Sequence, residues 1–145
     1  DHLHQFVVEG KKHATYSTSQ NESDMPFLRG AKDSSRYGVS HLLQKPGDSV
    51  LFEYDYGDSW QHAVKLHRVS EYADDEPKKV ALTGGANACP PDDCGGIYHY
   101  SYLMDLIRED IKSADLYDFY DWMGCKWDPE YFPQEQAAKA VDRMN

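Results

Sequence analysis

Two alternating runs of apolar and polar residues, at 50–56 and 60–66, flank a Gly-Asp-Ser stretch at 57–59. A period of two is typical of a strand with one buried face, because successive side chains point to opposite sides of a sheet. One face of the first run collects the residues Val50, Phe52, Tyr54 and Tyr56, and the other face collects Glu53 and Asp55. The pattern predicts a β-hairpin with polar groups at its tip.

The segments before this hairpin predict further strands and a short helix. Residues 3–8 and 13–17 fit two strands, and the polar, serine-rich stretch 17–36 fits a long surface loop. A short helix fits residues 40–44, with Ser40 as its N-cap. Because the first strand starts at the third residue, we expect the chain to begin inside a domain.

The segments after the hairpin are mostly irregular. An acidic loop is predicted over 70–79 and a brief strand over 80–82. The stretch 84–96 contains two adjacent prolines and several glycines. Since proline fixes φ and glycine allows positive φ, we expect this loop to have one defined shape.

From Tyr98 onward the apolar period changes to about 3.6, which predicts helices. The apolar positions of the first helix are Leu103, Leu106, Ile107 and Ile111. A second helix is predicted over 114–123 and ended by Gly124, and a last one over 134–144. The chain therefore predicts a single α+β domain, in which an antiparallel sheet with a central hairpin packs against C-terminal helices.

Size and charge narrow the classes of function. A chain of 145 residues can bury a core, and no apolar run reaches the roughly 18 residues of a membrane helix. The formal net charge is -10, whereas binding to nucleic acid by counterion release needs a basic face, so direct nucleic-acid binding is disfavoured. An odd number of cysteines and no visible signal peptide predict reduced thiols and a cytoplasmic protein.

The first group of candidate residues lies at the hairpin tip. If the two strands pair, Asp55, Asp58 and His62 converge near the turn. A carboxylate beside an imidazole suits metal ligation or general acid–base catalysis. The alternative is structural, with Asp58 accepting backbone hydrogen bonds in a tight turn and His62 covering a face of the sheet.

The second group is the pair Cys89 and Cys94. Two thiolates would favour zinc over magnesium, but their spacing is at the loose edge of the zinc-site pattern. A zinc site would therefore need histidines from elsewhere, such as His4 and His62. The alternative is two half-buried thiols in a rigid loop, without a metal.

Several weaker signals accompany these groups. The acidic pair Asp92 and Asp93 is more typical of a solvated loop than of an ion site, and Tyr98 at a helix start is more typical of core packing than of a stacking platform. The sequence contains no dinucleotide fingerprint, phosphate-binding loop, nucleophile elbow or His-Glu-x-x-His helix, which weakens the common nucleotide enzymes and hydrolases.

Four stretches of the chain together carry a resemblance to a known family. They are His2-Leu3-His4-x-Phe6, Leu42-Leu43-x-x-Pro46-Gly47-Asp48, Phe52-x-Tyr54-Asp55-Tyr56-Gly57-Asp58-x-Trp60-x-His62 and Ala88-Cys89-Pro90-Pro91-Asp92-Asp93-Cys94-Gly95-Gly96. In this order they resemble the plasmid pRiA4b ORF-3-like family, also described as insertion-element passenger proteins with a TnpR-like, resolvase-style name. The similarity runs from His2 to about Phe132.

The resemblance implies a compact α+β domain of plasmids, transposable elements and chromosomes, with no settled biochemical activity. Two features depart from the family pattern. The family's leading strand and helix are not in this sequence, and residues 81–82 stand where a further cysteine is common. The resolvase-style name implies no mechanism, since the chain lacks the basic DNA-binding tail of a serine recombinase.

We therefore expect a binding or interaction module for a protein or a small ligand, with a polar site between the hairpin tip and the loop 88–96, called here the Cys-Pro-Pro loop. The further residues expected to line this site are Trp60, Asp92, Asp93 and Tyr98. One alternative is a metal-dependent enzyme, such as a hydrolase, that uses Asp55, Asp58 and His62. Another is a protein-binding accessory of DNA transposition.

Overall fold

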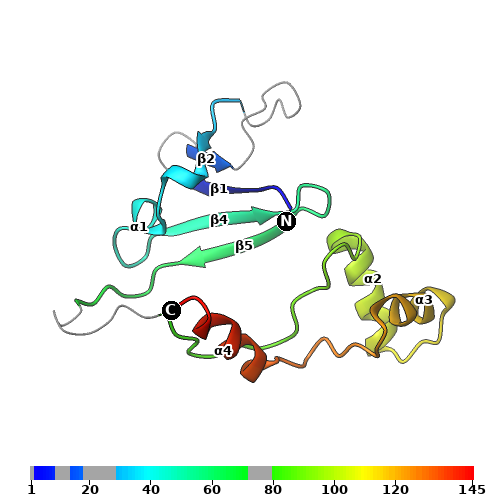
Figure 1. Cartoon of the computed structure of the whole chain (residues 1–145). Helices are drawn as coiled ribbons and strands as arrows, with labels where there is room; N and C mark the ends of the chain where they lie inside the picture. Colours follow the sequence, from blue (N-terminus) through cyan, green and yellow to red (C-terminus); the bar gives the residue numbers. More distant parts are fainter. Residues whose placement is uncertain (1, 9–13, 18–28, 72–79) are drawn as a thin grey trace. The chain divides into compact units, whose positions relative to one another are not determined.

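Five strands form one sheet in the order β3-β2-β1-β4-β5 (Figure 1). The strands are β1 His4–Val8, β2 Ala14–Ser17, β3 Lys32–Asp33, β4 Ser49–Tyr54 and β5 Trp60–Lys65. Neighbouring strands are antiparallel, except that β2 and β3 run parallel. The predicted hairpin is the pair β4–β5, and it occupies one edge of the sheet because β5 is outermost.

The computed structural model describes residues 2–8, 14–17, 29–71 and 80–145. The chain divides into two compact units, residues 1–70 with the sheet and residues 71–145 with the long helices. Together they give the predicted α+β fold class. That the sheet packs against the C-terminal helices stays a prediction, because the two belong to different units.

One face of the sheet carries a row of aromatic side chains. The register places Phe6 opposite Tyr16 on one side and opposite Phe52 on the other, and it pairs Phe52 with His62. The rings of Phe6 and Phe52 stack with their centroids 4.8 Å apart. Such aromatic pairs contribute about 0.5–1.5 kcal/mol beyond the area that they bury, so the row stabilises the pairing of strands distant in sequence.

The opposite face carries polar groups. Gln5 lies opposite both Ser17 and Glu53, and its amide donates a hydrogen bond to the Glu53 carboxylate. Ser17 is fully buried and its hydroxyl lies 2.8 Å from the hydroxyl of Tyr56. Tyr56 therefore does not continue the face of Phe52 as predicted, because the left-handed backbone of Asp55 (φ 57) ends the alternation one residue earlier.

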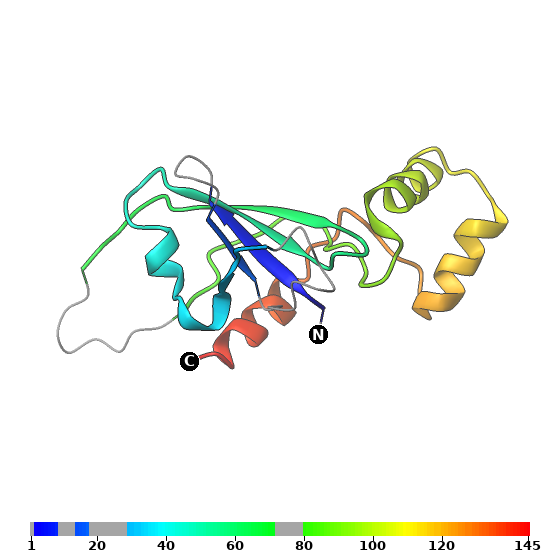
Figure 2. The ribbon, with the colours of Figure 1, turned by 90° about the horizontal axis from the view of Figure 1, so that it is seen from above.

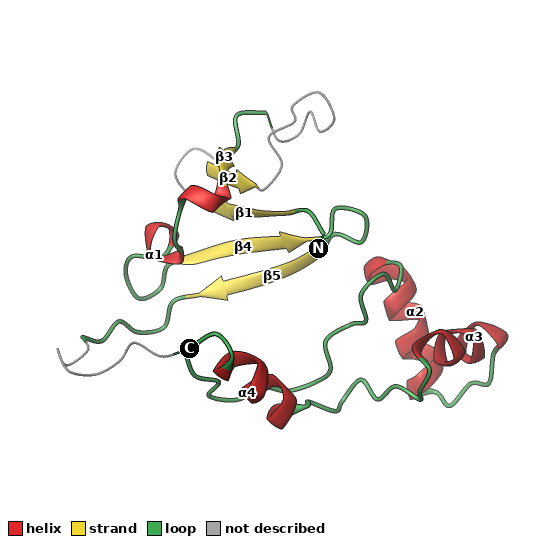
Figure 3. Cartoon of the chain, viewed as in Figure 1, coloured by secondary structure: helices red, strands yellow, loops and turns green. Residues whose placement is uncertain are grey.

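The stretch predicted as a long polar loop contains ordered elements beyond residues 18–28, which lie outside the described residues. Figure 3 labels β3 beside β2, and the 3-10 helix η2 (Ser34–Arg36) follows β3. The Lys32 ammonium lies 5.2 Å from the Tyr16 ring and 5.7 Å from the Tyr37 ring, so cation–π contacts accompany the short β3. A two-residue strand has no readable period, which is why the sequence pattern missed it.

The short helix α1 (Val39–Leu42) is present, but it begins one residue earlier than predicted. Its N-cap is Gly38, which makes no side-chain capping bond, so the prediction of Ser40 as N-cap is wrong. The turn after this helix is held instead by Asp48, whose carboxylate accepts hydrogen bonds from the backbone N–H groups of Gln44 and Lys45 at 2.8 and 2.9 Å.

The second unit contains α2 (Gly96–Arg108), α3 (Ala114–Met123) and α4 (Gln134–Asp142). Helices α2 and α3 lie side by side in both views (Figure 1, Figure 2), and Leu103 of α2 is fully buried. The predicted bounds of α3 are confirmed: Ser113 accepts a hydrogen bond from Leu116 N–H at its start, and Gly124 adopts φ 66 at its end. Helix α4 ends two residues before the predicted end.

Ile111 was predicted on the apolar stripe of α2, but it lies beyond the end of this helix. Its N–H donates to the carbonyl of Leu106 at 2.9 Å, and Asp110, with φ 51, donates to the carbonyl of Ile107 at 3.3 Å. These two bonds form a Schellman motif, in which the residue after the left-handed position contacts the last turn of the helix. Ile111 therefore falls at helical spacing because it belongs to the C-terminal cap of α2, not to the helix itself.

The strand predicted over 80–82 is absent from the described residues, so that prediction is wrong. The backbone of Val80 is satisfied by the side chain of Asn145 instead. The Asn145 amide accepts from Val80 N–H at 2.6 Å and donates to the Val80 carbonyl at 2.9 Å. Among the described helices, none combines the length and the apolar character needed to cross a bilayer.

Candidate functional site

The Asp55 carboxylate is the most constrained group at the hairpin tip. The residue is 8% exposed and adopts φ 57, a conformation that costs a non-glycine residue free energy. One carboxylate oxygen accepts from Gly57 N–H at 2.9 Å, and the other lies 3.5 Å from Nδ1 of His2. The Asp55 N–H also donates to the carbonyl of Leu3 at 3.0 Å, so the segment before β1 helps to hold this acid.

Asp58 lies in the same turn and has one buried carboxylate oxygen, Oδ2, for which the described part of the chain provides no hydrogen-bond partner. A buried polar atom without a partner costs free energy, and such atoms in native proteins commonly serve a ligand or bound water. The structural alternative, in which Asp58 and Ser59 accept backbone hydrogen bonds in the turn, therefore does not account for this oxygen of Asp58.

His62 lies farther from the tip than the sequence suggested. It is exposed and pairs with Phe52, three residues before Asp55, which corresponds to about 10 Å along a strand. Its Nδ1 lies 3.3 Å from the Phe52 carbonyl oxygen. The structure thus brings His2 to Asp55, and it places His62 on the aromatic row.

The two remaining candidates of the first unit also belong to the aromatic row. His4 lies opposite Tyr54, and its ring centroid is 5.5 Å from that of Phe52. Trp60 lies opposite Tyr54 from the other side, on β5. Both side chains are partly buried on the sheet, so each has a packing role in addition to any site role.

The predicted zinc ligands do not lie in one unit. Cys89 and Cys94 belong to the second unit, whereas His4 and His62 belong to the first. Within either unit, the described Cys, His, Asp and Glu side chains bring no three ligand atoms within 4.8 Å of one another. Zinc binding by these residues stays a prediction.

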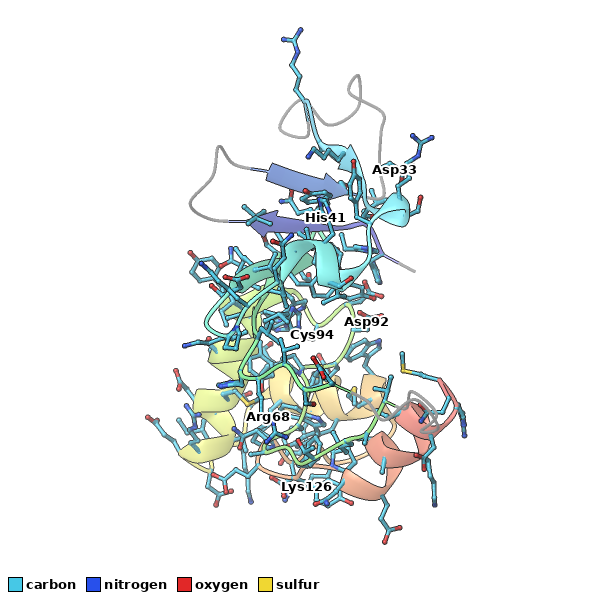
Figure 4. The ribbon with its side chains drawn as sticks, turned by 90° about the vertical axis from the view of Figure 1, so that its left-hand side faces the viewer. Asp33, His41, Arg68, Asp92, Cys94 and Lys126 are labelled. Carbon is cyan, nitrogen blue, oxygen red and sulfur yellow. The ribbon has the colours of Figure 1, made fainter. Side chains whose placement is uncertain are left out.

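The Cys-Pro-Pro loop has an unusual backbone just before α2. Asp93, Gly95 and Gly96 all adopt left-handed conformations, with φ of 58, 89 and 71. Figure 4 labels Asp92 and Cys94 on this loop, and Cys94 is buried whereas Cys89 is exposed. The loop is held at its start by the N–H of Ala88, which donates to the carbonyl of Pro129 at 2.9 Å. Two glycines in left-handed conformations and a long-range hydrogen bond thus shape this loop, and that it has a single shape stays a prediction.

The imidazole of His99 lies directly on this loop. Its Nδ1 is 2.7 Å from the Cys94 carbonyl oxygen, and a side chain added at Gly95 would meet the ring at 3.0 Å. Because a carbonyl can only accept, Nδ1 carries a proton, and in the neutral ring Nε2 is the acceptor. Glycine at position 95 therefore provides both the left-handed turn and the space for the ring.

A cavity of about 320 Å³ opens beside this histidine. Phe119 and Trp122 provide aromatic surface, and the carboxyl-bearing residues that line it are Asp93, Asp115 and Asp118. The hydroxyl of Tyr102 donates to Asp115 at 2.9 Å, and this hydrogen bond raises the pKa of Tyr102. The cavity is thus lined by both aromatic and acidic side chains.

Most of these residues were absent from the sequence predictions. On α3 the lining positions are Asp115, Asp118, Phe119 and Trp122, which follow the i, i+3, i+4, i+7 spacing of one helix face. That spacing was readable, but aromatic side chains also occur on the opposite face of this helix, so the pattern did not single out one face. Of the predicted residues, Asp93 and Cys94 line the cavity.

Two other predicted site residues lie outside the lining of this cavity. Tyr98 is 89% exposed, so the alternative of core packing is wrong for it. Asp92 is exposed on the loop, next to the lining residue Asp93. Tyr100, on the same helix as Tyr98, is partly buried, and its burial together with the nearby thiols of Cys94 and Cys89 raises its pKa.

The amino-acid sequence of this chain is similar to a known protein family and to one curated protein. The family model described as "Plasmid pRiA4b ORF-3-like protein" matches residues 1–136. The uncharacterized protein y4hQ of Sinorhizobium fredii is 28% identical over 118 residues, which cover 79% of this chain and 59% of that protein. This chain therefore spans about six tenths of the length of that relative.

A solved structure also resembles the chain. The crystal structure of the protein of unknown function MM3350 from Methanosarcina mazei Go1 has a TM-score of 0.62, with 24% identity. The similarity covers 92% of this chain and 71% of that one. It supports the fold, and neither of these relatives has a described activity.

Proposed function

This chain belongs to the plasmid pRiA4b ORF-3-like family, and we propose that it is a binding module whose second unit holds a small organic cation. The proposed site is the cavity between the Cys-Pro-Pro loop, α2 and α3. In this proposal the Cys-Pro-Pro loop forms one wall of the binding site, as the sequence led us to expect. That the hairpin tip forms an opposite wall stays a prediction.

The observation that carries the proposal is the combination of aromatic and acidic side chains in the lining of one cavity. Trp122 is 56% exposed and lines the cavity, so its ring is accessible to a ligand. A cation above an aromatic ring gains about 0.5–1 kcal/mol at an exposed site, and carboxylates add Coulombic attraction. Among the described residues that line the cavity, His99 is the only one with a basic side chain.

The size of the cavity favours a small ligand. Its volume of about 320 Å³ is at the lower end of the range of roughly 300–1,000 Å³ that is usual for ligand pockets. Apolar surface with a few polar groups suits a ligand that has both a hydrocarbon part and a positive charge. A bare metal ion would leave the aromatic surface without a partner.

Isothermal titration calorimetry with choline and its neutral isostere 3,3-dimethylbutan-1-ol tests the proposal. We expect choline to bind, and the alcohol to bind about tenfold more weakly or not at all, because only the charge differs. Asp118→Asn and Trp122→Leu should each weaken choline binding about two- to fivefold. Asp105→Asn is the matched control, since Asp105 lies on α2, pairs with Arg108 at 3.9 Å and is not a lining residue.

Equal binding of choline and the alcohol would show that charge is irrelevant and would contradict the proposal. So would binding of choline that Asp118→Asn and Trp122→Leu leave unchanged. A failure of choline together with binding of a primary amine such as agmatine would keep the cation site and change only the ligand shape.

A second candidate function is a metal-dependent enzyme that uses the hairpin tip. Two features favour it: the buried Asp55 carboxylate next to His2, and the buried Oδ2 of Asp58, which has no partner among the described residues. Elemental analysis of the purified protein tests this candidate. Stoichiometric metal that is lost in both Asp55→Asn and Asp58→Asn would support it, and its absence from the wild-type protein would count against it.

A further inference from the structure

A second cavity, of about 340 Å³, lies between the end of α2, the start of α3 and the loop after α3. Helix α3 contributes Leu116, Tyr117 and Tyr120 to it. These positions are on the side of α3 opposite to Asp115, Asp118 and Trp122, because residues one or five apart on a helix face different directions. The second cavity is therefore a separate feature from the proposed cation site.

Aliphatic side chains form part of the walls of this cavity. The apolar lining residues are Leu106, Ile107, Ile111 and Leu116. The Schellman motif at the end of α2 turns the chain so that Ile111, which is 43% exposed, lies next to Leu106 rather than continuing the helix. An apolar side chain that stays this exposed beside a cavity offers surface for an aliphatic ligand.

Most of the charged groups at this cavity have the opposite sign to those of the cation site. Among the described residues that line it, the charged ones are Lys112, Lys126 and Asp110, two cations and one acid, in a chain whose net charge is -10. Lys126 is labelled in Figure 4. Burial raises the pKa of Tyr120 above its ordinary value, and its phenol is protonated and able to donate a hydrogen bond at neutral pH.

We propose that this cavity binds an aliphatic carboxylate, with the hydrocarbon chain against Leu106, Ile111 and Leu116 and the carboxylate near the ammonium groups of Lys112 and Lys126. Ammonium groups and phenolic hydroxyls are donors that suit a carboxylate. The volume of about 340 Å³ limits the ligand to a short or medium chain.

A series of butanoate, hexanoate and octanoate, each compared with the alcohol of the same chain length, tests this proposal by calorimetry. Burial of each added methylene should tighten binding about fourfold until the cavity is full. The acids should bind more tightly than the alcohols. Lys112→Met and Lys126→Met should each reduce this preference about two- to fivefold. Lys139→Met on α4 is the matched control, because Lys139 is exposed and is not a lining residue.

Binding that strengthens with chain length, together with a carboxylate preference that both lysine variants reduce and Lys139→Met preserves, would support the proposal. No binding of any acid would overturn it, as would equal binding of acids and alcohols. Binding of an acidic amphipathic peptide without binding of octanoate would also overturn it and would assign the cavity to a protein partner. Since Lys112 and Lys126 are exposed, we expect their substitution to leave the fold intact, which circular dichroism checks.

Discussion

Substitution of Gly95 by alanine tests the central contact of the proposed cation site, the packing of the His99 ring on the Cys-Pro-Pro loop. Gly95 adopts φ 89, and a β-carbon there would lie 3.0 Å from Nδ1 of His99 and 3.2 Å from its Cβ. The ring would have to move by a few tenths of an ångström, which stretches the 2.7 Å hydrogen bond to the Cys94 carbonyl.

The cost can be worked out from two contributions. The left-handed conformation costs an alanine about 1–2 kcal/mol, of which about 0.4–1 kcal/mol is offset by the lower entropy of the unfolded chain. Weakening the hydrogen bond costs up to about 0.5–1.5 kcal/mol more. We therefore expect Gly95→Ala to lower the free energy of unfolding by about 1–2.5 kcal/mol.

Gly124→Ala is the matched control. Gly124 also adopts a left-handed conformation, with φ 66, but a β-carbon there would meet no atom within 4 Å. The difference between the two variants therefore isolates the contact with His99, which should be about 0.5–1.5 kcal/mol. In a His99→Ala background the extra cost of Gly95→Ala should become smaller, because the ring is gone and only the contact with Cβ of residue 99 at 3.2 Å remains.

The assay is urea unfolding followed by tryptophan fluorescence. A Trp60→Phe background leaves Trp122 and Trp127 as reporters, and both lie in the second unit. If Gly95→Ala is no more destabilising than Gly124→Ala, the packing of His99 on the loop is not a stabilising contact. A difference that is as large in the His99→Ala background as in the wild type would refute the ring as its cause.

The remaining predictions concern packing, capping and titration. Leu103→Ala should destabilise the second unit by about 2–5 kcal/mol in urea unfolding, because the side chain is fully buried, whereas Tyr98→Ala, at an 89% exposed position, should cost little. Ser113→Ala removes the N-cap of α3 and should cost about 0.5–2 kcal/mol, with Ser113→Asp as the variant that retains capping. Burial raises the pKa of Tyr56, so the stability linked to its neutral phenol is fully present below the unfolded pKa near 10 and is lost as pH rises through the higher folded pKa. An ultraviolet titration of tyrosine ionisation checks this. The number of tyrosines that ionise above the ordinary pKa should be one smaller in Tyr56→Phe than in the wild type.

Local patterns in the sequence were sufficient for the elements that depend on neighbouring residues. The hairpin β4–β5 and the helix α3 were predicted within one or two residues, because alternation, an N-cap serine and a C-terminal glycine act over a few positions. The same local reasoning failed for Ile111, because a residue of a C-terminal cap can have the same spacing as a residue inside the helix. It also failed for β3, because two residues are too few to show a period.

The candidate sites depended on contacts between distant parts of the chain. The sequence placed Asp55 at a turn, but only the pairing of β1 with β4 decided that its imidazole neighbour is His2 and that His62 lies on the aromatic row. A shift of register by one residue would have exchanged the faces, and no local pattern excludes it.

In the second unit, too, the sequence predicted local features, whereas the site depended on contacts between distant segments. The sequence by itself determined a rigid loop that ends in glycines and an amphipathic helix some twenty residues later. Only the tertiary structure decided that Asp93 and Trp122 line one cavity. The physical reason is that backbone conformation and capping are local, whereas a cavity exists only where elements far apart in the chain pack against each other without filling the space between them.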